Sequence, residues 1–198
     1  MTATRHEITR DDILPMADYV RARKERRRAL VALKKHRRLE VGPDCSFYFE
    51  NYETMWNQVH EMLFIEKGGE AQIADELSAY NPLIPKGREL VATVMFEIDD
   101  PVRRGALLAK LGGGRGDRIH PDRRRDHQRG VPEADVDRTS AAGKASSVQF
   151  IHFPFTEDQI AAFRGAGGEV VVGFSHPEYA HTTVLPGPVR QALSPDFD

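Results

Sequence analysis

The sequence predicts an α+β fold: a mainly antiparallel sheet with a long basic N-terminal helix and a helical hairpin. Three observations predict it. A segment rich in Arg, Lys, Ala and Leu, all strong helix formers, precedes Gly42-Pro43. Two segments with apolar residues at helical spacing are joined by Gly68-Gly69. Short runs rich in aromatic and β-branched residues alternate with helices without a strict β-α-β rhythm, which favours antiparallel strands.

Composition sets the broad class. The chain has 198 residues, of which 40% are hydrophobic and 29% charged, as in a globular protein rather than a disordered or membrane one. We expect one domain over residues 1–198. The single cysteine, Cys45, lies next to a predicted strand, excludes an internal disulfide and is expected to be buried. The N-terminus has no apolar stretch of a signal peptide and no run is long enough for a membrane span, so we expect a cytoplasmic protein.

In the N-terminal half, candidate helix caps at Thr9 to Asp12 precede the long basic helix. We expect this helix to run from Met16 to about Arg38 and to end before Gly42-Pro43. A narrow apolar stripe is expected to consist of Val20, Leu30, Val31 and Leu33. A strand is predicted at 46–50. Helices at 51–66 and 70–80, joined by a short glycine loop, would form the hairpin.

In the C-terminal half, residues 90–98 predict a strand and residues 101–111 a helix with Pro101 in its first turn. Further strands are predicted at 147–153, 169–174 and 182–185. A short helix capped by Thr156 is expected at 156–164, and a terminal helical turn at 188–193.

Residues 112–130 form an anomalous Gly/Arg-rich segment in which Ile119 is the only apolar residue. Polar loops this long are uncommon in compact domains, and no Gly-Lys-Ser/Thr follows to make a phosphate loop. With one chosen set of GC-rich codons, translating Gly114–Gln128 one base out of frame produces an alternating string with an Asp-Gly turn, typical of a β-hairpin. We therefore predict a compensated frameshift, which the sequence of the gene or of a relative would test.

The basic helix is the strongest charge feature. Residues 21–38 contain ten cations and one acid, Glu25, and leave 18 basic and 29 acidic residues elsewhere in the chain. The formal net charge of -2 therefore hides a basic helix on an acidic remainder. The helix face could be simply solvated, could meet an acidic protein partner, or could follow phosphates. Few aromatic residues interleave, so nucleic acid is the least favoured of the three.

The helical hairpin places polar residues on its apolar faces. Gln58 and Glu76 share the faces of the apolar residues, and Glu61 borders them. Buried polar groups need partners, so these side chains are expected to meet each other, Tyr80 or backbone. The alternative is an acid/base or metal site that uses Glu61, Glu76 and Tyr80. The Glu-x-x-His pattern of ferritin-like diiron bundles is absent from the hairpin.

The histidines allow a second interpretation of the same kind. His152 lies in a predicted strand, and His176 follows another. With Glu61 and Glu76 they form a candidate iron or zinc set, although their spacing matches no tight template. A lone strand histidine is more often a hydrogen-bonded structural residue, so the favoured expectation is a chain without a cofactor. No Gly-x-Ser-x-Gly elbow is present.

Several segments, as a set, resemble the bacterial family known as domain of unknown function 3501. They are Thr9–Pro15, Ala32–Arg38, Phe49–Asn51, Gln58–Met62, Glu76–Asn81, Thr93–Glu97, Ser147–Phe150 and His176-Pro177. The resemblance covers nearly the whole chain and departs at 113–129, where relatives resemble the hairpin of the shifted translation. The family has no assigned reaction, and its genes often lie beside those for a rubrerythrin and a heterodisulfide-reductase-like iron–sulfur protein. The resemblance therefore implies an accessory role in an oxidative-stress redox system.

These observations lead to three function hypotheses. The first is an accessory protein that docks a rubrerythrin-like or iron–sulfur partner through the basic helix and the hairpin. The residues expected at that contact are Arg23, Arg27, Lys34, Lys35, Arg38, Glu50, Asn51 and Asn81. The second is a metal-dependent enzyme with the Glu/His set, and the third is polyanion binding by the basic helix.

Overall fold

The computed structural model describes residues 5–112, 131–132, 146–165 and 168–198, and it confirms the predicted α+β class. The main sheet has the strand order β1-β2-β3-β5-β4, with every neighbouring pair antiparallel. Its strands are β1 (Arg38–Val41), β2 (Cys45–Glu50), β3 (Glu89–Phe96), β4 (Val131–Pro132) and β5 (Val148–Pro154). Strands β6 (Val171–Gly173) and β7 (Thr182–Val184) form a separate small sheet.

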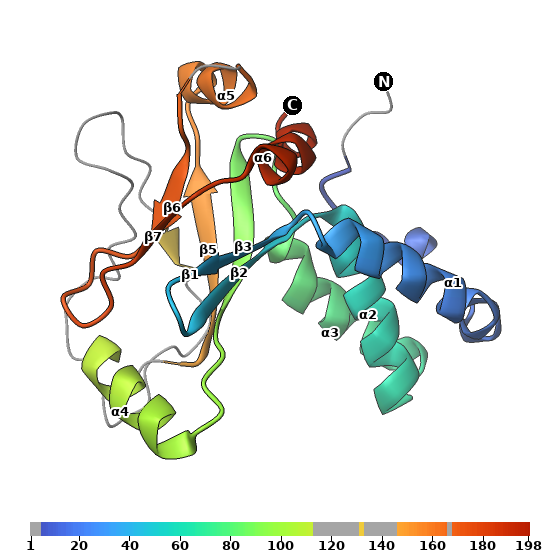
Figure 1. Ribbon diagram of the computed structural model, residues 1–198. Helices are drawn as coiled ribbons and strands as arrows, with labels where there is room; N and C mark the ends of the chain where they lie inside the picture. Colours follow the sequence, from blue (N-terminus) through green and yellow to red (C-terminus); the bar gives the residue numbers. More distant parts are fainter. Residues whose placement is uncertain (1–4, 113–130, 133–145, 166–167) are drawn as a thin grey trace.

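The helices divide between the two faces of the main sheet (Figure 1). One layer contains α1 (Met16–Lys34), α2 (Tyr52–Glu66) and α3 (Glu70–Tyr80). The other side holds α4 (Pro101–Gly112), α5 (Glu157–Arg164) and α6 (Gly187–Leu193), together with the small sheet. None of the helices in the described part of the chain is both long and apolar enough to cross a membrane.

Each layer has its own hydrophobic core. The larger core contains Phe47, Phe49, Val94 and Ile151 from the sheet, and Phe174, Leu193 and Phe197 from the C-terminal region. The smaller core joins the three N-terminal helices to the sheet residue Val91. Because successive strand side chains point to opposite faces, Val91 faces the helices while Leu90 and Ala92 face the larger core.

The hairpin forms as the sequence predicts. Asn51 begins α2, and its side chain accepts a hydrogen bond from the Thr54 amide at 3.0 Å. Lys67 ends α2 in the left-handed conformation with a φ of 57°, and Gly69 follows at 68°. This turn brings α3 back against α2, with Met55, Val59, Leu63 and Ile73 in the core between the N-terminal helices.

The basic helix differs from its prediction in two ways. It ends at Lys34 instead of Arg38, because the chain turns there and Arg38 begins the edge strand β1. The expected apolar stripe was also wrong: Val20 and Val31 are 49% and 72% exposed, whereas Tyr19 is fully buried. The strand predicted over 169–174 is shorter, at Val171–Gly173, and belongs to the small sheet. Apart from Gly112 at the end of α4, the anomalous segment of residues 112–130 lies outside the described residues.

Candidate functional site

The inner side of α1 is attached to α2 by a charged network around Glu61. Tyr19 donates its hydroxyl to Glu61 Oε1 at 2.6 Å, and Arg23 donates Nε and Nη2 to the two carboxylate oxygens, each at 2.7 Å. The Arg23 guanidinium also lies over the Phe64 ring, 4.3 Å from its centroid. The hydrogen bonds from Arg23 lower the pKa of Glu61 to about 2, while burial raises the pKa of Tyr19. Glu61 is therefore a bonded anion, held between two helices, and is a poor general base.

The buried His60 forms hydrogen bonds that hold the segment before α1 against α2. His60 accepts a hydrogen bond from the Leu14 amide at Nε2 (3.1 Å), so its proton lies on Nδ1, which donates to the Trp56 carbonyl at 2.7 Å. The ring packs against Trp56 and Tyr19, with centroid distances of 3.7 and 4.8 Å. Burial lowers the pKa of His60 and keeps it neutral. Sequence reasoning missed this role, because the sequence does not show that Leu14 lies beside this histidine.

The outer face of α1 has no comparable contacts. We define it as Val20, Lys24, Arg28, Val31 and the next helical residue Lys35, all of which are exposed. Within the described ranges, none of its three cations forms an ion pair, and neither does the neighbouring Arg27. Three other cations of the helix are engaged or lie over rings: Arg21 pairs with Asp18, Arg23 binds Glu61, and Arg26 lies over the Trp56 ring, 4.6 Å from its centroid.

The predicted contact residues thus separate into two groups. Arg27 and Lys35 are exposed, and Lys34 is half-buried. Arg23 is engaged with Glu61, and Arg38 forms ion pairs with Glu40 and Glu97. Arg37, which counted among the ten cations, is 2% exposed and pairs with Asp196 while donating to the carbonyls of Phe49, Glu50 and Ala192.

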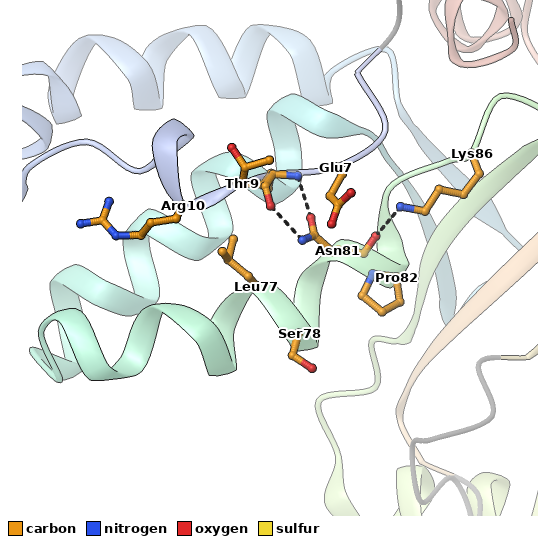
Figure 2. Close-up of a pocket in the computed structure, with 9 residues that line it drawn as sticks. Glu7, Thr9, Arg10, Leu77, Ser78, Asn81, Pro82 and Lys86 are labelled. Carbon is orange, nitrogen blue, oxygen red and sulfur yellow. Dashed lines mark hydrogen bonds between the residues drawn. The ribbon is translucent and has the colours of Figure 1, made fainter.

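The other predicted contact residues form hydrogen bonds within the fold. Glu50 is 4% exposed and accepts a hydrogen bond from Thr93 Oγ1 at 2.7 Å. Asn51 caps α2. Asn81 accepts from the Ile8 amide at 2.8 Å and donates to the Ile8 carbonyl at 2.9 Å, as Figure 2 shows. Each of these three side chains thus has a partner inside the molecule, and their part in a docking face stays a prediction.

An open groove lies beside Asn81, between the N-terminal segment and α3 (Figure 2). It is lined by Leu77 and Pro82 and by the polar side chains of Arg10, Asn81 and Lys86. These polar groups are engaged: Arg10 binds Glu70, and Lys86 donates to the carbonyls of His6 and Asn81. The groove therefore presents bonded polar groups together with the exposed side chains of Glu7 and Ser78.

The candidate metal and acid/base residues do not converge. Glu61 is held by Arg23, Glu76 accepts from Gln72 at 2.7 Å, and His152 Nδ1 lies 2.9 Å from Glu89 Oε2. His176 Nδ1 accepts from the Glu178 amide at 3.2 Å. In the described residues, no group of three or more His, Cys, Asp or Glu side chains is arranged to hold a metal. The predicted meeting of Gln58 with Tyr80 is present, at 3.4 Å, and Cys45 is buried with a raised pKa.

The comparison with family models places the chain. The model for proteins of unknown function DUF3501 matches residues 7–197. The chain belongs to the DUF3501 family. A solved structure of similar fold, described as a novel protein of unknown function from Burkholderia pseudomallei K96243, is 32% identical with a TM-score of 0.85, and the match covers 96% of this chain and 99% of that one. No curated protein matches the chain.

Membership of DUF3501 confirms the resemblance that the sequence motifs indicate. The family description assigns no reaction, so the function has to be argued from the geometry of this member. In that geometry, the outer face of α1 is a surface whose cations form no ion pair with any described residue.

Proposed function

We propose that this DUF3501 protein is an accessory protein that docks an acidic partner protein through the outer face of α1. The observation that carries the proposal is the set of exposed cations, Lys24, Arg28 and Lys35, which form no ion pair in the described part of the chain. Cations placed close together repel one another, and an anionic partner removes that repulsion on binding.

The acidic remainder of the chain strengthens the argument. Outside residues 21–38 the chain has 18 basic and 29 acidic residues, yet none of the acids in the described residues pairs with a cation of the outer face. Arg23 and Arg37, in contrast, form ion pairs with Glu61 and Asp196 and so stabilise the fold. The outer cations are thus available to a second molecule.

The family resemblance suggests which partner to test first. We propose a rubrerythrin-like non-haem-iron protein, or the iron–sulfur protein encoded near it, in an oxidative-stress system. In this arrangement the partner performs the redox chemistry and the DUF3501 protein contributes binding. The exposed cations of the outer face require that this partner present an acidic surface.

The test is a binding titration against the purified rubrerythrin-like protein at low salt. The triple variant Lys24→Glu, Arg28→Glu, Lys35→Glu should weaken binding about hundredfold, because three reversed charges at roughly 1 kcal/mol each amount to about 3 kcal/mol. A matched control reverses Arg88, Arg103 and Lys110, which lie in surface ion pairs away from α1. Equal weakening by both triples, or no binding by the wild type, contradicts the proposal.

Two rivals are tested by the same material. Heparin or duplex DNA that binds more tightly than the acidic protein, with a steep dependence on salt, would favour polyanion binding. Uptake of one iron or zinc per chain, lost in Glu76→Gln or His152→Asn, would favour the metal-dependent enzyme.

A further inference from the structure

The outer face of α1 combines charge with an apolar contribution. Its members occur at steps of four, four, three and four residues, which places them in one stripe along the helix. Val20 and Val31 stand in this stripe at 49% and 72% exposure, between and beside the cations. The face therefore offers a partner aliphatic contacts as well as positive charge.

The two valines set the shape of what can cover the face. They are 11 residues apart, which is about 16 Å along a helix that rises 1.5 Å per residue. Lys24 and Arg28 lie between them, and Lys35 follows one turn later. A partner must therefore offer two apolar contacts about three turns apart with negative charge between them.

A helix is the element that meets this requirement most simply. Helices that pack side by side match i±3 and i±4 rows, the same steps that this stripe has. An unstructured acidic tail could neutralise the cations but would not fix apolar groups at two points, and nucleic acid offers phosphates without aliphatic contacts. A second copy of this chain would bring cations against cations, which opposes self-pairing of the face.

We infer that the outer face of α1 binds an acidic amphipathic helix of the partner, with carboxylates opposite Lys24, Arg28 and Lys35 and aliphatic residues opposite Val20 and Val31. This inference rests on the proposed function and specifies the element that the partner presents. The inner side of α1 stays on α2 in the complex, since Tyr19 and Arg23 are already bound there.

The test titrates the full chain at low salt with two synthetic probes of equal net charge. One is an amphipathic helix with Leu at positions 11 apart and Glu between them, and the other is polyglutamate. Val20→Thr with Val31→Thr keeps side-chain shape and should weaken binding of the helix about tenfold, because one methyl is lost at each of two contacts. Binding of polyglutamate should change little. Val102→Thr, at a valine on α4 that is 78% exposed, is the control.

The outcomes separate this inference from the proposed function. The helix inference is wrong if the double valine variant binds the helical probe as tightly as the wild type does. It is also wrong if polyglutamate binds the wild type as tightly as the helical probe does. Neither result contradicts docking of an acidic partner. No effect of the charge-reversal triple on either probe overturns both. Tighter binding to duplex DNA, or to vesicles of anionic lipid, than to the helix overturns the inference in favour of a different class of partner. Failure of the wild type to bind the helix also contradicts it.

Discussion

The basic segment from Met16 to Arg38 has two sides that use the same residue types differently. On the inner side, Arg23 places two nitrogens on Glu61, and Arg37 is buried against Asp196 and three carbonyls. On the outer side, Lys24, Arg28 and Lys35 are exposed without ion pairs in the described residues. Cations that are neighbours in the sequence therefore do not all belong to the same surface of the folded protein. Pairing and burial decide which cations serve the fold and which are available to a partner.

The largest effect expected on the inner side is at Arg37. Arg37→Ala leaves the Asp196 carboxylate and three carbonyls without their buried donor, and should cost about 3–5 kcal/mol of the free energy of unfolding. Urea denaturation measures it. Lys35→Ala, two residues away but exposed, is the control and should change stability by less than about 0.5 kcal/mol. If both variants lost similar amounts of the free energy of unfolding, the distinction between structural and exposed cations would be wrong.

Glu61 comes second. Glu61→Gln keeps the size of the side chain but removes the charge that Arg23 and Tyr19 bind, and should cost about 2 kcal/mol at neutral pH. The folded pKa of Glu61 lies at about 2, below its ordinary 4.5. The contribution of Glu61 is therefore complete above pH 4.5 and disappears as the pH falls toward 2. Denaturation curves at pH 7 and pH 3 should differ less in the variant than in the wild type.

His60 sets a third, pH-dependent effect. Burial holds its pKa below the ordinary 6.5, so below that pH the unfolded chain binds a proton that folded His60 refuses. The stabilisation that comes from neutral His60 is therefore fully present above pH 6.5. Below that pH the free energy of unfolding falls by up to about 1.4 kcal/mol per pH unit. His60→Gln should be less stable at pH 7.5 but should lose less between pH 7.5 and 5.5. An unchanged slope in the variant would remove His60 as the cause.

The smallest effect is expected on the outer face. The triple variant Lys24→Glu, Arg28→Glu, Lys35→Glu should unfold within about 0.5 kcal/mol of the wild type, because exposed cations without partners contribute little to stability. Thermal and urea denaturation test this. A loss of several kcal/mol would mean that these cations are structural, and the comparison of the two sides would fail.

Much of the fold could be predicted from the sequence, because periodicity reports local structure. The hairpin and the strands β3 and β5 follow directly from apolar spacing. The edge strand β1 was missed because Arg38–Val41 is short and continues a run of good helix formers. The valines of α1 were assigned to an apolar stripe, whereas the helix enters the smaller core through Tyr19, its only buried residue.

Less of the site could be predicted, because its decisive contacts are distant in sequence. Arg37 meets Asp196 across 159 positions, and Arg23 meets Glu61 across 38. Nothing in the local pattern separates these arginines from Arg28 or Lys35. The candidate metal ligands illustrate the same limit: their residue types fit iron or zinc, but their actual partners are Arg23, Gln72 and Glu89. The frameshift hypothesis for residues 113–129 stays a prediction that the gene sequence tests.

The most direct test of acidic docking reverses the charges on the outer face of α1 and on the helical probe, separately and together. The acidic helical probe and a copy with every Glu replaced by Lys are each titrated against the wild type and the charge-reversal triple. We expect the wild type to bind only the acidic helix and the triple variant to bind only the lysine helix. Both interactions should be lost at high salt. A triple variant that does not bind the lysine helix, or a wild type that binds both helices equally, would contradict the account.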